Sequence, residues 1–323
     1  MKTREGSVMN SPRNAIVVGI SADGYESALD FAVAEARRTA RPLHLIHVLQ
    51  LPAGEAYAGV YGGALETANA TLSDAVDKAE RVLGPDTPVS GEVIDNGWTV
   101  DNLVRGTAGD QLLVLQHRAL SPVHRLFAGS VVQGVAGRSH VPVVSVPEGW
   151  APRTGTPPVV TAAVQNPVEA PALLRIAFEE ARARGARLVV LHAWWLASGY
   201  DVVVVVVDNT FRAEWTERTN LEIEPVLKPL RAEFPDVDVT LEVRHAPPLE
   251  TVLDAADSSD LVVLGRRHHR LPLGSHLGPV ARGALAHATT PVLITPELAV
   301  AKEAVPEARR GDALTAVQLA TSR

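Results

Sequence analysis

Two stretches of the chain, EARRTARPLHLIHV (residues 35–48) and EARARGARLVVLHA (residues 180–193), begin with the same three residues and share a leucine and a histidine. The shared histidines, His47 and His192, are separated by 145 positions. Later pairs, now at an offset of 149, are Val114 with Val263, Arg118 with Arg267, Gly129 with Gly278 and Pro142 with Pro291. Matches that keep one order over so long a stretch indicate that the chain contains two diverged copies of one domain.

Apolar runs alternate with helical patterns in the same order in each copy. Ala15 to Ile20 is a continuous apolar run, which is typical of a strand buried on both faces of a parallel sheet. Ala28, Phe31, Ala32 and Ala36 then recur at helical spacing. The alternation predicts an α/β fold in which each copy forms a five-stranded parallel sheet with helices on both faces. Further expected strands are Leu43 to Leu49, Gly91 to Ile94, Leu112 to Leu115 and Val141 to Val146, with Leu188 to Trp194, Val237 to Val243, Leu261 to Leu264 and Pro291 to Thr295 as counterparts.

Two segments of copy two depart from this regular pattern. Pro225 and Pro229 fall inside its second helical pattern, which we therefore expect to kink or break there. Val202 to Val207 is a run of six valines that fits none of the expected elements. An extra strand, an oligomer contact and a packed loop remain as alternatives for it.

A stretch rich in Pro, Gly and Thr separates the two copies. We expect a disordered N-terminus at residues 1–13, one domain at residues 14–148, a linker at residues 149–157 and a second domain at residues 158–297. Residues 298–323 are rich in Ala and charge and are expected to form a frayed or disordered tail.

The composition favours a cytoplasmic protein that binds neither nucleic acid nor membranes. The chain has 323 residues, a formal net charge of -7 and no cysteine. A nucleic-acid partner calls for a concentrated basic face, and the lack of cysteine excludes disulfides, thiolate catalysis and Cys-based metal sites. The sequence contains no apolar stretch long enough to span a membrane and no signal-like start.

Any ligand is expected beyond the carboxyl ends of the strands, as in other open parallel sheets. After the fourth strand, copy one reaches Gly129-Ser130 and copy two reaches Gly278-Pro279, each at the start of a helix. A glycine there lets backbone N–H groups approach a phosphate, and a following hydroxyl donates or caps. A bound phosphate and a plain cap remain alternatives for Gly129-Ser130, whereas Gly278-Pro279 favours an ordinary helix start.

The order of the elements and this loop resemble those of the universal stress protein family, and in particular its tandem two-domain members from actinobacteria. The resemblance covers about Arg13 to Pro147 and Pro157 to Pro296. It implies two domains of the adenine-nucleotide α-hydrolase-like, or Rossmann-like, class that form a pseudo-two-fold pair. Because single-domain members dimerise through the fifth strand, it also implies contact between Pro142 to Val146 and Pro291 to Thr295. A homodimer of the whole chain stays open.

ATP-binding members of this family carry Gly-x2-Gly-x9-Gly-(Ser/Thr) after the fourth strand, an acidic residue after the first strand and an adenine-reading main chain at the end of the second. Carried over by position, the cofactor-binding residues of copy one are Ser21, Val48, Gln116, Ala119, Gly129, Ser130 and Val131. Those of copy two are Gln165, Ala193, Gly265, His268, Gly278 and Val280, with Pro279 at the hydroxyl position. Because Gln116, Ala119 and His268 replace glycines, we expect ATP binding to be weak or absent in both copies.

Other polar residues point less directly to chemistry. The basic run Arg266 to Arg270 either contributes positive charge to bind a phosphate or forms a solvated loop, and the solvated loop is favoured. His47 and His192 are expected to be hydrogen-bonded core residues. No metal is predicted, because a group of four histidines in copy two follows no ligand spacing: His268, His269, His276 and His287.

No catalytic motif accompanies these features. The sequence has no nucleophile elbow, no Gly-x4-Gly-Lys-(Ser/Thr) loop and no paired carboxylates at helical spacing. The family resemblance implies a stress-responsive adaptor or binding module with degenerate ATP sites and an unknown protein partner, and the missing catalytic motifs favour a protein that is not an enzyme. A slow ATP-hydrolysing or nucleotidyl-transfer enzyme and a ligand-free scaffold are the alternatives.

Overall fold

The computed structural model describes residues 14–50, 56–117, 131–166, 170–195, 209–266 and 277–296. The predictions made for Val202 to Val207, for residues 1–13 and for the tail fall outside these ranges.

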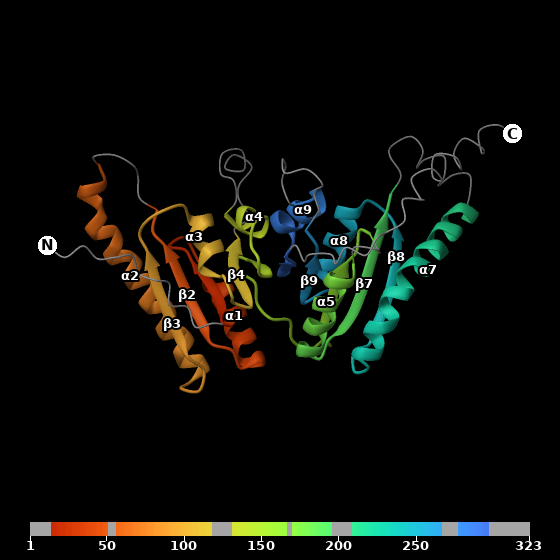
Figure 1. The fold of residues 1–323 in the computed structure, drawn as a ribbon, viewed down its shortest axis with the longest axis horizontal. Coiled ribbons are helices and arrows are strands. Elements are labelled where there is room, and N and C mark those ends of the chain that lie inside the picture. Colours follow the sequence, from red (N-terminus) through yellow and green to blue (C-terminus); the bar gives the residue numbers. More distant parts are fainter. Residues whose placement is uncertain are drawn as a thin grey trace.

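Strands and helices alternate along both copies, in the order that the sequence predicts (Figure 1). Copy one contains β1 (Ile16–Ile20), α1 (Glu26–Thr39), β2 (Leu43–Val48), α2 (Ala56–Leu83), β3 (Val89–Ile94), α3 (Thr99–Gly106), β4 (Leu112–His117), α4 (Val131–Ala136) and β5 (Val143–Pro147). Copy two contains β6 (Val159–Ala163), α5 (Pro171–Arg184), β7 (Arg187–Trp194), α7 (Asn209–Glu233), β8 (Val239–His245), α8 (Pro248–Asp257), β9 (Leu261–Leu264), α9 (Pro279–His287) and β10 (Val292–Ile294).

The described strands of both copies join in a single ten-stranded sheet, in the order β3-β2-β1-β4-β5-β10-β9-β6-β7-β8. Within each copy all neighbouring strands are parallel, with β1 between β2 and β4 and β6 between β7 and β9. This confirms the predicted α/β class and the five-stranded parallel sheet of each copy. It also leaves the carboxyl ends of each copy's parallel strands at one edge, where the site is expected.

The fifth strands form the junction between the copies, as the resemblance implies. β5 and β10 are antiparallel, and Val144 pairs with Leu293 at the centre of the contact. Antiparallel pairing of equivalent strands is what a two-fold relation between the copies requires. The junction therefore continues the sheet from one copy into the other.

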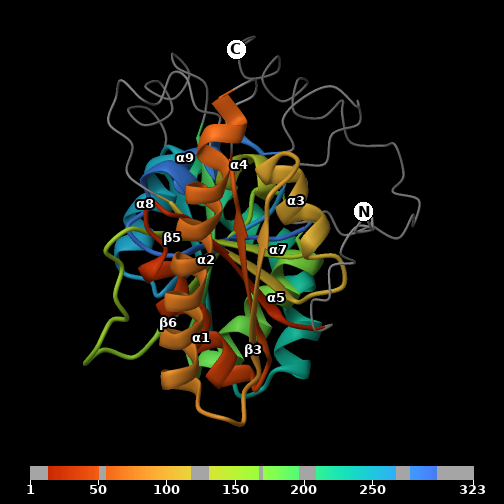
Figure 2. The same cartoon turned by 90° about the vertical axis from the view of Figure 1, so that its left-hand side faces the viewer.

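Each face of the sheet is covered by helices from both copies. One core packs α1, α2, α5 and α7 against side chains such as Val18, and the other packs α3, α4, α8 and α9 against side chains such as Val17. Successive residues of a strand point to opposite faces, which is why neighbours in β1 enter different cores. The outermost helices, α2 and α7, lie at the two ends of the molecule, and α2 faces the viewer in the turned view (Figure 2).

The second helix of copy two does not break at its prolines. α7 runs through Pro225 and Pro229 as one helix, so of the two expected outcomes the break was wrong, and the kink stays a prediction. Both prolines are exposed, while Ile223 and Leu227 are fully buried on the opposite face. The carbonyl that loses its N–H donor at Pro225 belongs to Leu221, a residue that is 68% exposed. Packing of the buried face thus outweighs the lost hydrogen bonds.

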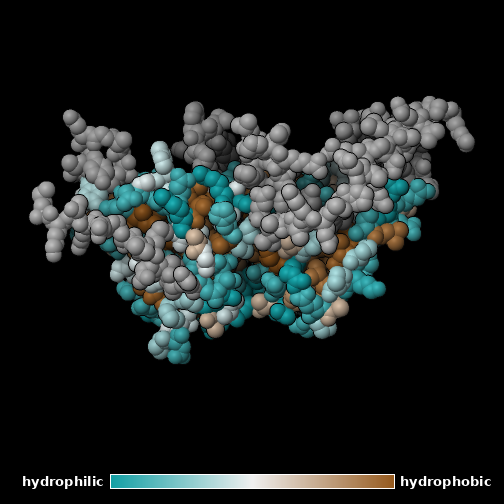
Figure 3. All heavy atoms as spheres, viewed as in Figure 1, coloured by the Kyte–Doolittle hydropathy of each residue, from teal (hydrophilic) through white to brown (hydrophobic). Residues whose placement is uncertain are grey.

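Hydrophilic residues cover most of the described surface in the view of Figure 3, and hydrophobic residues show as separate patches. Among the described helices, none has both the length and the apolar character that crossing a bilayer requires.

Candidate functional site

A cavity of about 290 Å³ opens in copy two, at the carboxyl ends of β6, β7 and β9. Each strand contributes a backbone segment to its wall: Gln165 follows β6, Ala193 lies near the end of β7 and Gly265 follows β9. Much of the rest of the wall is apolar and includes Leu173 and Val252. An apolar hollow with a few polar groups is the usual form of a small-molecule site.

The structure brings together five of the six residues that the sequence assigns to the site of copy two. Gln165, Ala193, Gly265, Gly278 and Val280 all line the cavity. The sixth residue, His268, lies outside the described residues. Pro279, at the hydroxyl position, also lines the cavity and begins α9 as an ordinary first-turn proline.

Two helices start at the wall of this cavity. Ala170 precedes α5 and Gly278 precedes α9, and both residues line the space. Neither helix start receives a side-chain cap within the described part of the chain. First-turn N–H groups have no partner inside their own helix, and the helix dipole places partial positive charge there. These two ends therefore favour a ligand with acceptor or anionic groups.

In copy one, Gln116 closes the corresponding helix end. Its Oε1 accepts hydrogen bonds from the backbone N–H of Ser27, at 2.9 Å, and of Ala28, at 3.4 Å. The N-cap residue of α1, Tyr25, makes no side-chain cap of its own. An amide from β4 thus occupies N–H groups of α1 whose counterparts in α5 belong to Ala172 and Leu173, and Leu173 lines the cavity of copy two.

The placement of Gln116 corrects the sequence analysis, which put it in the loop after the fourth strand. Gln116 and His117 extend β4, because they pair with Val146 and Pro147 of β5. The counterpart strand β9 ends at Leu264. The side chain at position 116 is therefore held in the sheet and directed onto α1, where a loop residue would be free to move away.

The two copies distribute side-chain volume differently at this point. Gln116 corresponds to Gly265, and Ala28 on the first helix corresponds to Leu173. A Cβ added at Gly265 would lie 3.1 Å from Cδ1 of Leu173, closer than ordinary packing allows. Copy one has the long residue on the strand and the small one on the helix, and copy two has the reverse. As a result, the backbone of Gly265 borders the cavity directly.

Three further predicted residues of copy one, Ser21, Val48 and Val131, belong to the described part of the chain. Ser21 follows β1 and accepts a hydrogen bond from the backbone N–H of Asp23 through its Oγ, at 3.2 Å. Val48 is the last residue of β2, and Val131 is the first residue of α4. Ala119, Gly129 and Ser130 lie outside the described residues. A bound phosphate and a plain helix cap therefore both remain as alternatives for Gly129-Ser130.

Arg266 lines the cavity of copy two and also reaches copy one. Its Nη1 donates to the carbonyl oxygens of Ser139, at 3.0 Å, and Ala136, at 3.4 Å. For Arg266 the solvated-loop reading was wrong, because the residue is half-buried and contacts the far side of the junction. Arg267 to Arg270 lie outside the described residues. The basic run pointed to Arg266, but nothing in the sequence identified its partners.

The two matched histidines differ in their surroundings. His192 is buried, and its Nδ1 contacts the carbonyl oxygen of Val164 at 2.9 Å, which confirms the expected core hydrogen bond. His47 is buried too, but its Nδ1 has no hydrogen-bond partner among the described residues, so that prediction was wrong for His47. Burial lowers the pKa of His47 below its ordinary value, which favours a neutral ring in the core.

An aromatic cluster that the sequence analysis did not single out lies beside the site. The ring of Trp194 lies 4.0 Å from that of His245 and 5.5 Å from that of Trp215, between centroids. Trp195 stacks on His245 at 5.3 Å and is 46% exposed. The adjacent tryptophans at the end of a strand were the available signal. The cluster joins β7, β8 and α7 next to Ala193.

No three His, Cys, Asp or Glu side chains in the described ranges lie close enough together to hold a metal ion. Among the described residues that line the cavity, none carries a carboxylate. Metal-assisted phosphoryl transfer needs such a group to hold its cation. The described wall therefore offers binding contacts without this catalytic element.

Comparisons with known proteins identify the family. The model of the universal stress protein family matches residues 12–147 and again 159–296. A universal stress protein of Mycolicibacterium smegmatis is 27% identical over 304 residues, which cover 89% of this chain and 98% of that protein. Another, from Mycobacterium tuberculosis, is 30% identical over 212 residues, but the match covers 64% of this chain and only 65% of that protein, less than two thirds of its length.

Solved structures agree at the level of the fold. The crystal structure of a universal stress protein from Archaeoglobus fulgidus is 16% identical, covers 88% of this chain and 96% of that one, and has a TM-score of 0.60. A protein from Pseudomonas aeruginosa, at 17% identity and a TM-score of 0.54, covers 89% of this chain. With two domain matches that together span most of the sequence, the chain belongs to the universal stress protein family, as a tandem two-domain member.

Proposed function

We propose that the protein is a cytoplasmic, stress-responsive binding module that holds one adenine nucleotide weakly, in the cavity of copy two. Copy one serves as a structural partner whose own site is closed by Gln116. In this proposal a bound nucleotide determines the conformation in which the protein binds a protein partner. No chemical step is required.

The cavity itself carries the proposal. It lies where the resemblance to ATP-binding family members puts the ligand, and five of the six residues carried over from the sequence line it. Its volume of about 290 Å³ is at the small end of ligand pockets. Leu173, Leu191 and Val252 offer apolar contacts for a flat ring.

Comparison of the two copies suggests which ligand atom goes where. In copy one the Oε1 of Gln116 takes the N–H groups of Ser27 and Ala28. Their counterparts in copy two are the N–H groups of Ala172 and Leu173, at the start of α5. A ligand acceptor in the cavity would replace the glutamine oxygen there. Gly265 supports this, since its backbone, which carries no side chain, borders the cavity directly.

The lining favours binding over catalysis. Phosphoryl transfer relies on a positioned carboxylate and metal, and the described lining residues include Arg266 but no Asp or Glu. An enzyme that hydrolyses or transfers nucleotides therefore has less support than a binding module.

A transplant of the closed arrangement tests the proposal. Changing Leu173→Ala together with Gly265→Gln gives copy two the residue pair of copy one, with little change in total side-chain volume. The wild-type protein is expected to show a small rise in Tm in millimolar ATP and one nucleotide per chain by calorimetry, because a ligand that binds only the native state stabilises it. The double variant is expected to lose both signals.

The matched control is Gln116→Ala, which leaves copy two unchanged and should keep the ATP response. The melting temperature without ligand reports whether each variant is folded. If wild-type protein shows no response to ATP and releases no small molecule on denaturation, the ligand-free scaffold replaces this proposal. If ATP turns over in the presence of magnesium, the enzyme alternative does.

A further inference from the structure

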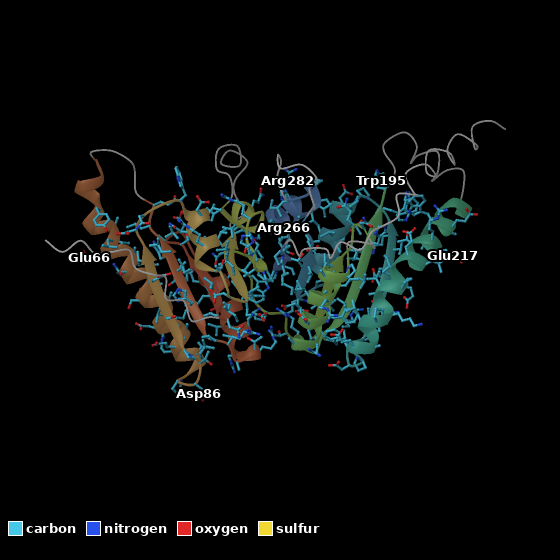
Figure 4. All side chains as sticks on the ribbon, viewed as in Figure 1. Glu66, Asp86, Trp195, Glu217, Arg266 and Arg282 are labelled. Carbon is cyan, nitrogen blue, oxygen red and sulfur yellow. The ribbon has the colours of Figure 1, made fainter. Side chains whose placement is uncertain are left out.

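Arg266 belongs to two parts of the molecule at once. It immediately follows Gly265 at the end of β9 and lines the cavity of copy two. Figure 4 labels it in the middle of the molecule, close to α9 and near the boundary between the copies. Its Nη1 crosses that boundary and donates to the carbonyl oxygens of Ala136 and Ser139 in copy one.

The contact with copy one is well matched electrostatically. Ala136 is the last residue of α4, and its carbonyl belongs to the group that has no partner within the helix. A guanidinium at this end also meets the negative pole of the helix dipole. Arg266 therefore fixes the end of α4 from the neighbouring domain.

The position of Arg266 on the cavity wall favours an anionic ligand. Arg266 is the one charged side chain among the described residues that form the wall. The starts of α5 and α9 add partial positive charge on the same space. Because a guanidinium has five N–H donors in a rigid fork, one arginine can contact a phosphate while it also holds carbonyl oxygens.

We propose that Arg266 binds the anionic group of the ligand of copy two while Nη1 keeps its hold on α4, so that an anion in the cavity tightens the junction between the two domains. This inference rests on the proposed function. It adds which ligands the cavity selects and how a bound ligand affects the other copy. Arg266 selects phosphorylated over neutral ligands, and the bound anion orders the end of α4 in the other copy. By linkage, whatever loosens the junction weakens anion binding to the same extent.

Three probes separate the roles of Arg266: adenosine, which has no phosphate; inorganic pyrophosphate, which has no base; and ATP, which has both. Calorimetry is carried out on the wild-type protein, on Arg266→Met and on Arg282→Met. Arg282 is an exposed residue of α9, labelled near Arg266 in Figure 4, and its substitution removes the same charge without touching the cavity wall.

With Arg266→Met, ATP and pyrophosphate are expected to bind about tenfold more weakly or worse, because a charge-assisted hydrogen bond is lost. Adenosine is expected to bind as it does to wild type. Arg282→Met should leave all three affinities within about twofold, as for an exposed charge. Arg266→Lys keeps the charge but loses the fork, and should recover only part of the ATP affinity.

Hydrogen exchange measures directly how well the backbone at the junction is protected. Saturating ATP is expected to slow exchange in residues 131–141 of the wild type, and saturating adenosine is not. In Arg266→Met, ATP at a concentration that restores saturation should give no such protection. Equal losses for adenosine and ATP, or protection of residues 131–141 that survives in Arg266→Met, would overturn the inference while the proposed site stands. If none of the three probes binds the wild type, the proposed function fails, and this inference fails with it.

Discussion

The carboxylate of Glu35 in copy one accepts a hydrogen bond from Nη2 of Arg184 in copy two, at the contact between α1 and α5. The Nη1 of the same guanidinium pairs with Glu180, four residues before it. Glu35 and Arg184 are both nearly inaccessible to solvent, with side chains 5% and 7% exposed. Glu35 and Glu180 occupy equivalent positions in the two copies, so Arg184 bridges a symmetric pair of acids at the junction. Arg38, which is 27% exposed, pairs with the other carboxylate oxygen of Glu35 at 2.6 Å.

The charge states in this cluster depend on one another. Burial raises the pKa of Glu180 above its ordinary value, although Arg184 opposes the shift. Burial also disfavours the charge on Arg184, but Glu180 and Glu35 outweigh it and raise the pKa of the guanidinium. Removing Arg184 would leave Glu180 without its cation and Glu35 with only the partly exposed Arg38.

Arg184→Met is therefore expected to lower the free energy of unfolding by about 3–5 kcal/mol, the usual effect of leaving a buried charge uncompensated. Urea denaturation followed by circular dichroism measures it. The triple variant with Glu35→Met and Glu180→Met should regain most of the loss, since replacing buried ions together by apolar groups is often neutral and the remaining Arg38 is partly exposed to water. A triple variant less stable than Arg184→Met would contradict this account.

Opening copy one is the reciprocal of the transplant proposed above. Ala28→Leu with Gln116→Gly gives copy one the residues of copy two, and should raise the number of nucleotides bound per chain from one to two. It should also destabilise the protein by about 1 kcal/mol, because α1 loses the cap that Gln116 provides. Calorimetric stoichiometry and urea denaturation test both parts. A stoichiometry that stays at one would show that Gln116 is not what closes copy one.

The repeat made the fold predictable, because apolar periodicity reflects burial that both copies share. Ala15 to Ile20 had to be a strand buried on two faces, and Val17 and Val18 do enter different cores. The contact between fifth strands followed from the family resemblance and is confirmed by the pairing of Val144 with Leu293. Five residues assigned to copy two by position also meet at one cavity.

What the sequence did not predict are contacts in which the copies differ. Arg184 corresponds to Thr39 in copy one, so alignment of the copies gives no hint that it pairs with Glu35. Gln116 looked like a damaged glycine position, whereas its side chain has a partner 88 and 89 residues away in α1. Such contacts depend on which side-chain ends meet after folding, and local patterns carry no information about that.

The prolines of α7 give a third test. Because α7 runs through Pro225 on its exposed face, Pro225→Ala adds an N–H donor without disturbing the core. The free energy of unfolding is expected to rise by roughly 1–2 kcal/mol, since proline costs about 3 kcal/mol in a helix interior and about 1 kcal/mol is offset in the unfolded chain. Glu222→Ala, on the same exposed face, serves as the control and should change stability by less than about 0.5 kcal/mol. An unchanged or reduced stability in Pro225→Ala would mean that the helix is adapted to its prolines.

The last prediction concerns acid. His117 at the end of β4 is buried, and its Nδ1 lies 2.8 Å from the hydroxyl of Ser145 in β5. Burial lowers the pKa of His117, and His287 of copy two lowers it further. Below the ordinary pKa of histidine, about 6.5, the unfolded chain takes up a proton that the native state resists. Stability is therefore expected to fall as the pH drops below about 6.5, and His117→Asn should make that fall shallower. Urea denaturation between about pH 7 and about pH 5 measures the slope, and His140→Asn, at an exposed position, should leave it unchanged. If His117→Asn retains the wild-type slope, protonation of His117 does not limit the stability of the protein in acid.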